Sequence, residues 1–586
     1  MVFKIQQPEG RPLNGGDLLA QSLKSLGVDV SFGLGGGHLD GFLLGCEHAG
    51  IRLIDTRHET AAVQAAEGYA RTTGKVGSCF MTANSGFLNG LPGLGTALAD
   101  RNPICCITSS QPLKDVDSNG LQGFHDQIVV ARTVSKFVHR IAHIEEIPRV
   151  VAYAFRQATV GAPGPVVIDL PVSLMFAPVN VDVIQLGAIN SPMPAPPAPD
   201  RNAIIAAAAL WRSAERPVII TGSKSSSPRS AELLSYIVEI TNTPVFHTTS
   251  YGPSIPVDSP LQAGFANRLA LLLKNEEPRP DLVILIGTRT GTFLGGRGGR
   301  IIPKEGCKVV HIEADGSELG KICHVDVSIT SSPEQALEAF KGEIEKDQWK
   351  ASKAWATRLG ELKDAYSFYE KEPETNAAGQ LHPYHALKRA FSALKPGAII
   401  CADGGEAAFW ALDMAQYATP SAVMYTCGYL GFLGNGWGYA LGAAIGAPTR
   451  QVINVQGDGS AGFHIAELDT YARFKLNILT VILNNHVWGM SLHAQDIIFA
   501  GRTKARPAAL LSSGTAYEVV AQGFENANAK ITTMDEIDGT VRELSAHPGP
   551  ACINMIVSGG PTHHGLEALV MSNLEPDTVR IPYFAM

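Results

Sequence analysis

The sequence has no basic tract, and its formal net charge is −8 over 586 residues. We therefore do not expect nucleic acid as a main partner. The nine cysteines include the adjacent pair Cys105-Cys106, but the sequence has no CxxC and no zinc-like cysteine spacing. Buried, reduced thiols are expected rather than disulfides or a zinc site.

Targeting signals are also missing. The N-terminal stretch MVFKIQQPEGRPLNGG has no apolar segment of the kind found in signal peptides, and the C-terminal YFAM is not a peroxisomal signal of the SKL kind. Met414 to Thr449 carries no charged residue, but Pro420, Asn435 and many glycines interrupt it. A tightly packed segment beside a buried ligand fits better than a membrane span. We expect a cytoplasmic protein without membrane association.

The length predicts about three or four domains at roughly 150 residues each. Apolar strand patterns alternate with helical patterns, as in Val30–Leu34 followed later by Thr60–Thr72, and the Pro-rich Ala188–Asp200 is typical of a linker. This alternation predicts an α/β fold of three doubly wound, parallel-sheet domains. The expected boundaries are 1–187, 201–350 and 378–560, followed by a C-terminal tail at 561–586.

One stretch, Gly457 to Asn485, carries the strongest chemical signal. An apolar run leads into Gly457-Asp458-Gly459-Ser460, a helix is expected after Ser460, and a second apolar run ends at Asn484-Asn485. A right-handed crossover would bring Asp458 and Asn485 together at the carboxyl edge of a parallel sheet. Carboxylate and amide oxygens suit Mg²⁺ bound together with phosphates, and the glycines allow close approach of a phosphate. The stretch predicts a Mg²⁺-diphosphate site.

This motif, with its GDG and its later NN, resembles the signature of thiamine-diphosphate enzymes. Such enzymes also have a glutamate at a strand end in the N-terminal domain, and Arg57-His58-Glu59-Thr60 matches that pattern. The resemblance implies that the three domains are a pyrimidine-binding, a central and a diphosphate-binding domain, with thiamine diphosphate and Mg²⁺ as cofactors.

Much of the chain further resembles benzaldehyde lyase, a carboligase of the superfamily that includes acetolactate synthase and pyruvate decarboxylase. The similar stretches are FGLGGGHLD (32–40), IDTRHETAAVQAAEGYAR (54–71), LQGFHDQ (121–127), GYLGFLGNGWGYALGA (428–443), NNHVWGMSLH (484–493) and PACINM (550–555). The resemblance as a whole spans all three domains and is weakest in the middle domain and the tail.

The resemblance implies specific roles for matching residues. Glu59 would hydrogen-bond N1′ of the aminopyrimidine, and Mg²⁺ would be held by Asp458, Asn485 and the carbonyl of Val487. The other expected cofactor-binding residues are Ala407, Gly431, Leu433, Gly459 and Ser460. At Glu406 only main-chain contact with the diphosphate is expected, because its carboxylate would repel phosphate.

Substrate selection depends on positions outside this set. Gln122 matches an active-site glutamine of the family and is expected to be catalytic together with Glu59. The expected substrate pocket contains Gly35, His38, Gln122 and Met490. Gly35 replaces a histidine of benzaldehyde lyase, and Met490 adds bulk, so both put an aromatic aldehyde substrate in doubt.

The favoured function is a carbon–carbon lyase or carboligase that makes or cleaves 2-hydroxy ketones (acyloins) through a C2 ylide and an enamine. The alternatives are an acetolactate synthase-like or 2-oxo acid decarboxylase activity and a non-catalytic cofactor-binding paralogue. No FAD fingerprint is identifiable between Val218 and Asp315, and the first domain has no adjacent His-His pair of the pyruvate decarboxylase type. The partners expected are small aldehydes, acyloins or 2-oxo acids, and a second copy of the chain in a homodimer or homotetramer with active sites at subunit interfaces.

Overall fold

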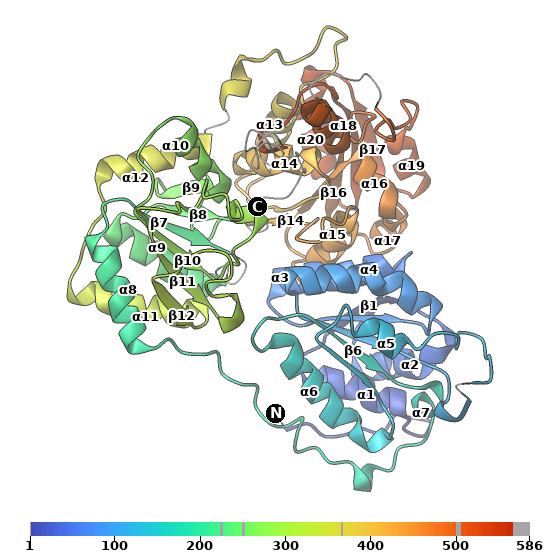
Figure 1. The fold of residues 1–586 in the computed structure, drawn as a ribbon. Coiled ribbons are helices and arrows are strands. Elements are labelled where there is room, and N and C mark those ends of the chain that lie inside the picture. Colours follow the sequence, from blue (N-terminus) through green and yellow to red (C-terminus); the bar gives the residue numbers. More distant parts are fainter. Residues whose placement is uncertain are drawn as a thin grey trace.

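The computed structural model describes residues 2–115, 117–222, 225, 227–248, 252–364, 367–499 and 506–566. Within this part of the chain, the strands form three parallel sheets of six strands each. The sheets lie in three lobes, coloured blue, green to yellow, and orange to red along the chain (Figure 1). The expected α/β fold with three doubly wound domains is confirmed.

The N-terminal domain has the strand order β2-β1-β3-β4-β6-β5. Helices α1, α2 and α6 pack on one face, and α3 and α4 cover the other. The strands are β1 (Val30–Leu34), β2 (Arg52–Asp55), β3 (Gly77–Met81), β4 (Ile104–Thr108), β5 (Phe137–Arg140) and β6 (Pro165–Asp169). The helices are α1 (Gly15–Ser25), α2 (Asp40–Ala49), α3 (Glu59–Thr73), α4 (Ser85–Asp100), α5 (Gln127–Ala131), α6 (Ile147–Thr159) and α7 (Val172–Met175).

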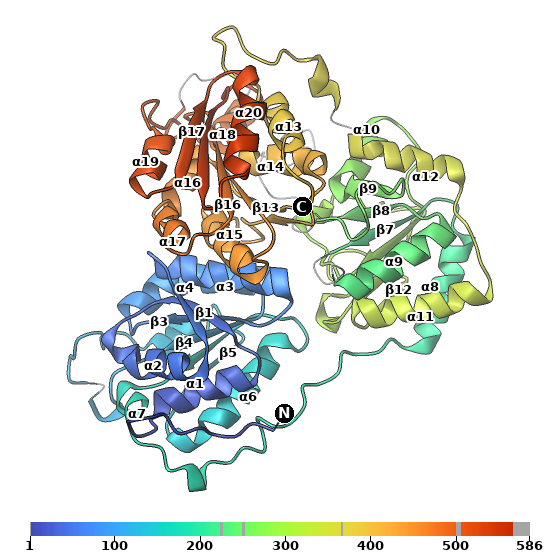
Figure 2. The same cartoon turned by 180° about the vertical axis from the view of Figure 1, so that it is seen from behind.

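The central domain follows an extended connection that Figure 2 shows running below it. Its strand order is β12-β11-β10-β7-β8-β9. The strands are β7 (Pro217–Thr221), β8 (Val245–His247), β9 (Gln262–Phe265), β10 (Leu282–Ile286), β11 (Lys308–Glu313) and β12 (Val327–Thr330). The helices are α8 (Arg201–Ser213), α9 (Pro228–Thr241), α10 (Ala270–Lys274), α11 (Pro333–Lys346) and α12 (Lys353–Gly360).

The C-terminal domain has the order β14-β13-β15-β16-β18-β17, which repeats the topology of the N-terminal sheet. Its strands are β13 (Ile399–Ala402), β14 (Ala422–Tyr425), β15 (Val452–Gly457), β16 (Ile478–Asn484), β17 (Ala527–Ile531) and β18 (Ala551–Ile556). Its helices are α13 (Pro383–Ser392), α14 (Glu406–Met414), α15 (Asn435–Gly446), α16 (Asp458–His464), α17 (Glu467–Arg473), α18 (Gly489–Phe499), α19 (Tyr517–Gly523) and α20 (Met534–Ser545).

The N- and C-terminal domains pack through helices α3 and α15, which lie side by side in both views. Gly438 and Gly442 of α15 face the backbone of α3, and a Cβ at either position would collide with it. Within the uncharged segment 414–449, helix α15 therefore packs tightly through small residues. Tight packing of this segment was expected from the sequence. Among the described residues, no helix is long and apolar enough to span a membrane.

One expected element differs. The helix predicted to begin after Ser460 begins instead at Asp458 and ends at His464, and a second short helix begins at Glu467. Gly457 thus ends β15 and caps the helix, and Asp458 and Gly459 belong to the first turn of α16 rather than to a separate turn before it. The carboxylate of Asp458 is consequently placed directly at the end of β15.

Candidate active site

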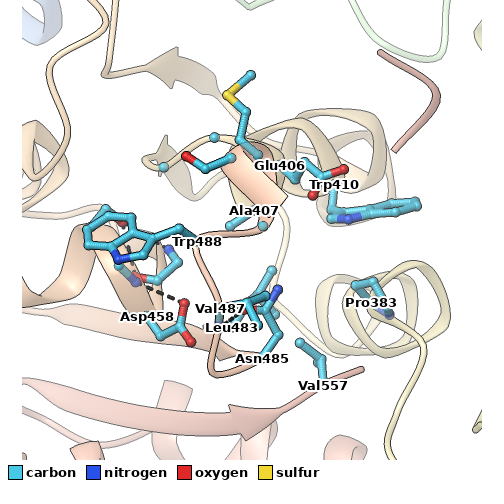
Figure 3. Close-up of a pocket in the computed structure, with 18 of the residues that line it drawn as sticks. Pro383, Glu406, Ala407, Trp410, Asp458, Leu483, Asn485, Val487, Trp488 and Val557 are labelled. Atoms are coloured by element: carbon cyan, nitrogen blue, oxygen red, sulfur yellow. Dashed lines mark hydrogen bonds between the residues drawn. The ribbon is translucent and has the colours of Figure 1, made fainter. Parts of the chain in front are cut away.

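A cavity of about 300 Å³ opens at the carboxyl ends of the C-terminal strands. It is lined by the segments that follow β13, β15, β16 and β18, and Figure 3 shows these side chains converging on it. Parallel sheets bind ligands at this edge. The lining residues are Pro383, 404–407, Trp410, Gly431, Leu433, 457–460, Leu483, Asn485, 487–491, 557–558 and Pro561.

Asp458 is the buried acid of this cavity, with 5 % of its surface exposed. Its Oδ2 accepts a hydrogen bond from the main-chain N–H of His486 at 2.6 Å, and its Oδ1 accepts one from Gly459 at 2.9 Å. Burial raises the pKa of Asp458 to about 6, although these hydrogen bonds oppose the shift. A bound cation would supply the opposite charge that this buried carboxylate needs.

Asn485 follows β16 and faces the same cavity. Its Oδ1 accepts the N–H of Val487 at 3.2 Å, so the turn that carries Val487 is fixed against the amide. Asp458, Asn485 and Val487 thus line one cavity, and the carboxylate, amide and carbonyl oxygens of these residues are the candidate metal ligands. The described residues contain no group of three His, Cys, Asp or Glu side chains that could hold a metal. This oxygen-only set fits Mg²⁺ shared with a phosphate ligand.

Glycines keep the cavity open. A Cβ at Gly459 would lie 2.5 Å from the ring of Trp488, and one at Gly405 would lie 2.8 Å from Cβ of Met490. Any side chain at these positions would displace the wall of the cavity. The hydroxyl of Ser460 donates to Gln456 Oε1 at 2.8 Å and accepts the N–H of Gly457 at 3.0 Å, so here it stabilises the turn.

The sequence analysis missed the role of the Glu406 side chain. This carboxylate is 5 % exposed, lines the cavity, and pairs with Nδ1 of the buried His493. It also accepts the main-chain N–H of His563 at 2.8 Å. Burial lowers the pKa of His493, but the hydrogen bond and charge of Glu406 outweigh burial and raise it overall. The imidazole thus compensates a carboxylate that would otherwise repel phosphate.

Glu59 lies elsewhere in the chain. It begins α3 in the N-terminal domain, is 6 % exposed, and accepts a hydrogen bond from Nδ2 of Asn89 at 3.1 Å. All residues that line the cavity belong to the C-terminal domain, between Pro383 and Pro561. A single chain therefore does not bring Glu59 into the wall of the cavity that contains Asp458.

The residues expected in the substrate pocket are likewise divided between the C-terminal cavity and the N-terminal domain. Met490 lines the cavity. Gln122 lies in an N-terminal domain loop with φ +62°, next to Leu121, which is 86 % exposed. Gly35 is exposed at the end of β1, and His38 is half-buried, with burial lowering its pKa. Gly35, His38 and Gln122 are not part of the cavity wall formed by this chain.

Comparisons with known proteins match three domains of thiamine pyrophosphate enzymes. The N-terminal TPP binding domain matches residues 13–130, the central domain residues 204–340, and the C-terminal TPP binding domain residues 403–555. The expected cofactors, thiamine diphosphate with Mg²⁺, are confirmed by this match.

Similar proteins over most of the chain are named acetolactate synthases. The acetolactate synthase large subunit IlvG of Mycobacterium tuberculosis is 29% identical over 547 residues, covering 93% of this chain and 96% of the relative. Acetolactate synthase 1, chloroplastic, of Oryza sativa is 28% identical over 559 residues, covering 93% and 85%. A probable acetolactate synthase large subunit of Methanocaldococcus jannaschii is 27% identical over 551 residues, covering 93% and 92%.

These relatives support the superfamily but not the specific resemblance to benzaldehyde lyase. Each matched range covers most strands of one of the three sheets, and Asp458 and Asn485 lie within the matched C-terminal TPP binding domain. The chain belongs to the thiamine pyrophosphate-dependent enzymes.

Proposed function

We propose that the chain is a carboligase of the acetolactate synthase type, which joins small 2-oxo acids or an oxo acid and an aldehyde. The similarity to acetolactate synthases over 93% of the chain carries this proposal. These relatives support the acetolactate synthase-like alternative of the sequence analysis better than the acyloin lyase chemistry favoured there. Acyloin cleavage is kept as the second candidate, because Gln122 and its LQGFHDQ loop resemble benzaldehyde lyase.

The C-terminal cavity would hold the diphosphate and the metal. Asp458, Asn485 and the carbonyl of Val487 are the proposed Mg²⁺ ligands, since the three residues line one cavity and carry the oxygen donors that Mg²⁺ prefers. Main-chain groups at Ala407, Gly459 and Ser460 would bind the diphosphate, and Gly431 and Leu433 would support the rest of the cofactor. When bound, thiamine diphosphate supplies the electron sink for breaking a bond next to a carbonyl group.

The N-terminal domain would supply the acid and base groups. We propose that Glu59 holds a proton at N1′ of the aminopyrimidine and that Gln122 orients the substrate oxygen. Gly35 and His38, at the end of β1, would line the substrate pocket with Met490. The buried position of Glu59 at the start of α3 fixes its carboxylate before any ligand arrives.

A second copy of the chain would join these two halves. Glu59 and Gln122 do not line the cavity of their own chain, and apolar side chains near both halves are exposed. Leu121 is 86 % exposed and Phe124 84 % in the N-terminal domain, and Leu430 is 51 % exposed beside Gly431. Burying such side chains against a partner is favourable. We therefore propose a homodimer or homotetramer with active sites between subunits.

Product analysis tests the reaction. The purified chain with thiamine diphosphate and Mg²⁺ is given pyruvate alone, pyruvate with an aldehyde, and an acyloin alone. The proposal expects CO₂ from pyruvate together with a 2-hydroxy-2-methyl-3-oxo acid or another coupled product. Cleavage of the acyloin without CO₂ from pyruvate would support the second candidate instead.

A further measurement separates either enzyme from a non-catalytic cofactor-binding paralogue. Exchange of the C2 proton of bound thiamine diphosphate is followed in the wild type and in Glu59→Gln. Fast exchange in the wild type and slow exchange in the variant are expected. Slow exchange in both proteins, with the cofactor bound, would overturn the catalytic proposal.

A further inference from the structure

A second cavity lies between the central and C-terminal domains and shares no lining residue with the cofactor cavity. Its volume is about 50 Å³. This is room for about three or four water molecules, or for a small organic ion. We call it the interdomain cavity; its polar lining residues are His247, Gln262, Arg268, Lys363, Asp413 and Gln416.

Two neighbouring buried side chains in its wall, His247 and Gln262, each have one nitrogen without a hydrogen bond of good geometry among the described residues. His247 is 5 % exposed and Gln262 is 3 % exposed. Within the described part of the chain, neither Nδ1 of His247 nor Nε2 of Gln262 has a hydrogen-bond partner of good geometry. The Oε1 of Gln262 accepts the N–H of Gly264 at 2.9 Å, so this bond fixes which end of the amide is unsatisfied. Buried polar groups without partners are costly, and a bound molecule would satisfy them.

The charge of the wall favours an anion. Arg268 is 3 % exposed, Lys363 is half-buried, and Asp413 is the one acid among the lining residues. Burial, and then the nearby charge of Arg268, lower the pKa of His247 to about 3, while the neighbouring Gln262 opposes this shift, so the imidazole is neutral. Two cations and one anion leave the cavity with an excess positive charge.

The backbone conformation at Gly264 allows Arg268 to lie against the main chain. Gly264 has φ +85°, and a Cβ at this residue would collide with the guanidinium of Arg268. A glycine with a positive φ is thus required for the arginine to lie beneath this turn. The guanidinium carbon lies 5.8 Å from the centre of the Phe265 ring. The cation is therefore held in place at the cavity rather than extended into solvent.

A chain of buried contacts runs from this arginine to the cofactor cavity. Nη2 of Arg268 lies 3.4 Å from Oδ1 of Asp413, and Oδ2 of Asp413 lies 2.9 Å from Nε2 of His563. The main-chain N–H of His563 donates to Glu406, whose carboxylate lines the cofactor cavity. The contact of Arg268 with Asp413 is the longest link, so a competing anion can replace it most easily.

We propose that the interdomain cavity binds a carboxylate of two or three carbons, and that this binding alters the affinity of the cofactor cavity. The carboxylate would accept hydrogen bonds from Gln262 Nε2 and would pair with Arg268 and Lys363. Arg268 would then release Asp413, which keeps His563 as its partner. The altered Asp413–His563 contact would reach Glu406 through the His563 N–H.

Acetate is the probe, because it has no ketone for the enzyme to act on and its binding does not depend on the proposed reaction. Binding of radiolabelled acetate to the full chain is measured by equilibrium dialysis, at constant ionic strength set with chloride. Thiamine diphosphate and Mg²⁺ are present at saturation to block the cofactor cavity. One acetate per chain is expected, with affinity reduced at least tenfold in Gln262→Leu and in Lys363→Met.

Lys395→Met, at an exposed lysine that lines neither cavity, is the matched control and is expected to bind acetate as the wild type does. Lys363→Met keeps the test decisive if Gln262→Leu fails to fold, because Lys363 is half-buried. Absence of saturable binding, or equal binding by the wild type and both cavity variants, would overturn the site.

The coupling has its own measurement. The dissociation constant of thiamine diphosphate is expected to change at least threefold when acetate is added to the wild type, and acetate binding must change by the same factor when the cofactor is added. Asp413→Asn is expected to bind acetate but to lose this change. If acetate binds to the wild type but the affinity for the cofactor is unchanged, the coupling is refuted, while the proposed acetate site still stands.

Discussion

The carboxylate of Glu467 accepts a hydrogen bond from the main-chain N–H of Arg57 at 3.0 Å, across 410 residues of sequence. The same Oε1 accepts the N–H of His58 at 3.2 Å. A side chain of the C-terminal domain thus holds the turn that places Glu59 at the start of α3. The position of the proposed catalytic glutamate therefore depends on the packing of two domains of one chain.

Replacing Glu467 tests this dependence. Glu467→Ala would leave the N–H groups of Arg57 and His58 without their acceptor, and we expect it to lower the free energy of unfolding by about 2 to 4 kcal/mol. Glu467→Gln keeps one acceptor oxygen and should lose about 1 kcal/mol. Denaturant unfolding measures both. In the folded alanine variant, kcat is expected to fall while the affinity for thiamine diphosphate changes little. Equal stability of the two variants would contradict this account.

Glu67 gives a pH prediction. It is fully buried in α3 and accepts hydrogen bonds from Thr96 and Asn102, and also from Tyr439 of α15. Burial raises the pKa of Glu67 from 4.5 to about 8, and the nearby charge of Asp100 adds a smaller increase. The three hydrogen bonds oppose this shift but do not cancel it. Because the pKa is higher in the folded than in the unfolded state, the stability that protonated Glu67 contributes is complete below about pH 4.5. It is lost as the pH rises towards 8.

Glu67→Gln removes this titration. We expect the stability of the wild type, relative to Glu67→Gln, to fall by on the order of 3 to 5 kcal/mol between about pH 5 and 8. Chemical unfolding of both proteins over this range measures the difference. Parallel pH profiles would show that Glu67 is ionised in the folded protein throughout.

Gly459 and Gly462 form a matched pair in helix α16. A Cβ at Gly459 would lie 2.5 Å from the Trp488 ring, whereas a Cβ at Gly462 has nothing within 4 Å among the described residues. We expect Gly459→Ala to weaken thiamine diphosphate binding at least tenfold, because the tryptophan must shift into the cavity. Gly462→Ala should bind as the wild type does. Titration calorimetry distinguishes them, and equal affinities would argue against a close-packed diphosphate site.

The sequence predicted the fold best where strands are buried on both faces. The apolar run at Val30–Leu34 and the run that ends at Asn484-Asn485 coincide with β1 and β16, because parallel strands inside an α/β domain need continuous apolar sequence. It did not predict edge strands such as β5 (Phe137–Arg140), whose residues are only half-buried and therefore lack that pattern.

The candidate site could also be predicted only in part from the sequence. Asp458 and Asn485 could be paired from sequence because a single strand–helix–strand unit brings them together. The Glu406–His493 contact could not, since it joins the first turn of α14 to α18 across 87 residues and depends on how two helices pack. The absence of Glu59 from the cavity wall of its own chain was expected only through the family resemblance, which implies active sites between subunits. In the structure it follows from the placement of α3 against α15.

The most direct test of the account mixes two inactive variants. Glu59→Gln damages the N-terminal half-site, and Asp458→Ala damages the C-terminal half-site. If each active site joins Glu59 of one copy to Asp458 of another, hybrid dimers contain one intact site and one doubly damaged site. Random assortment makes half of the dimers hybrids, so refolding the mixture is expected to restore about a quarter of wild-type activity. Activity no greater than that of either variant alone, in a mixture where differently tagged copies co-purify, would contradict a site shared between subunits.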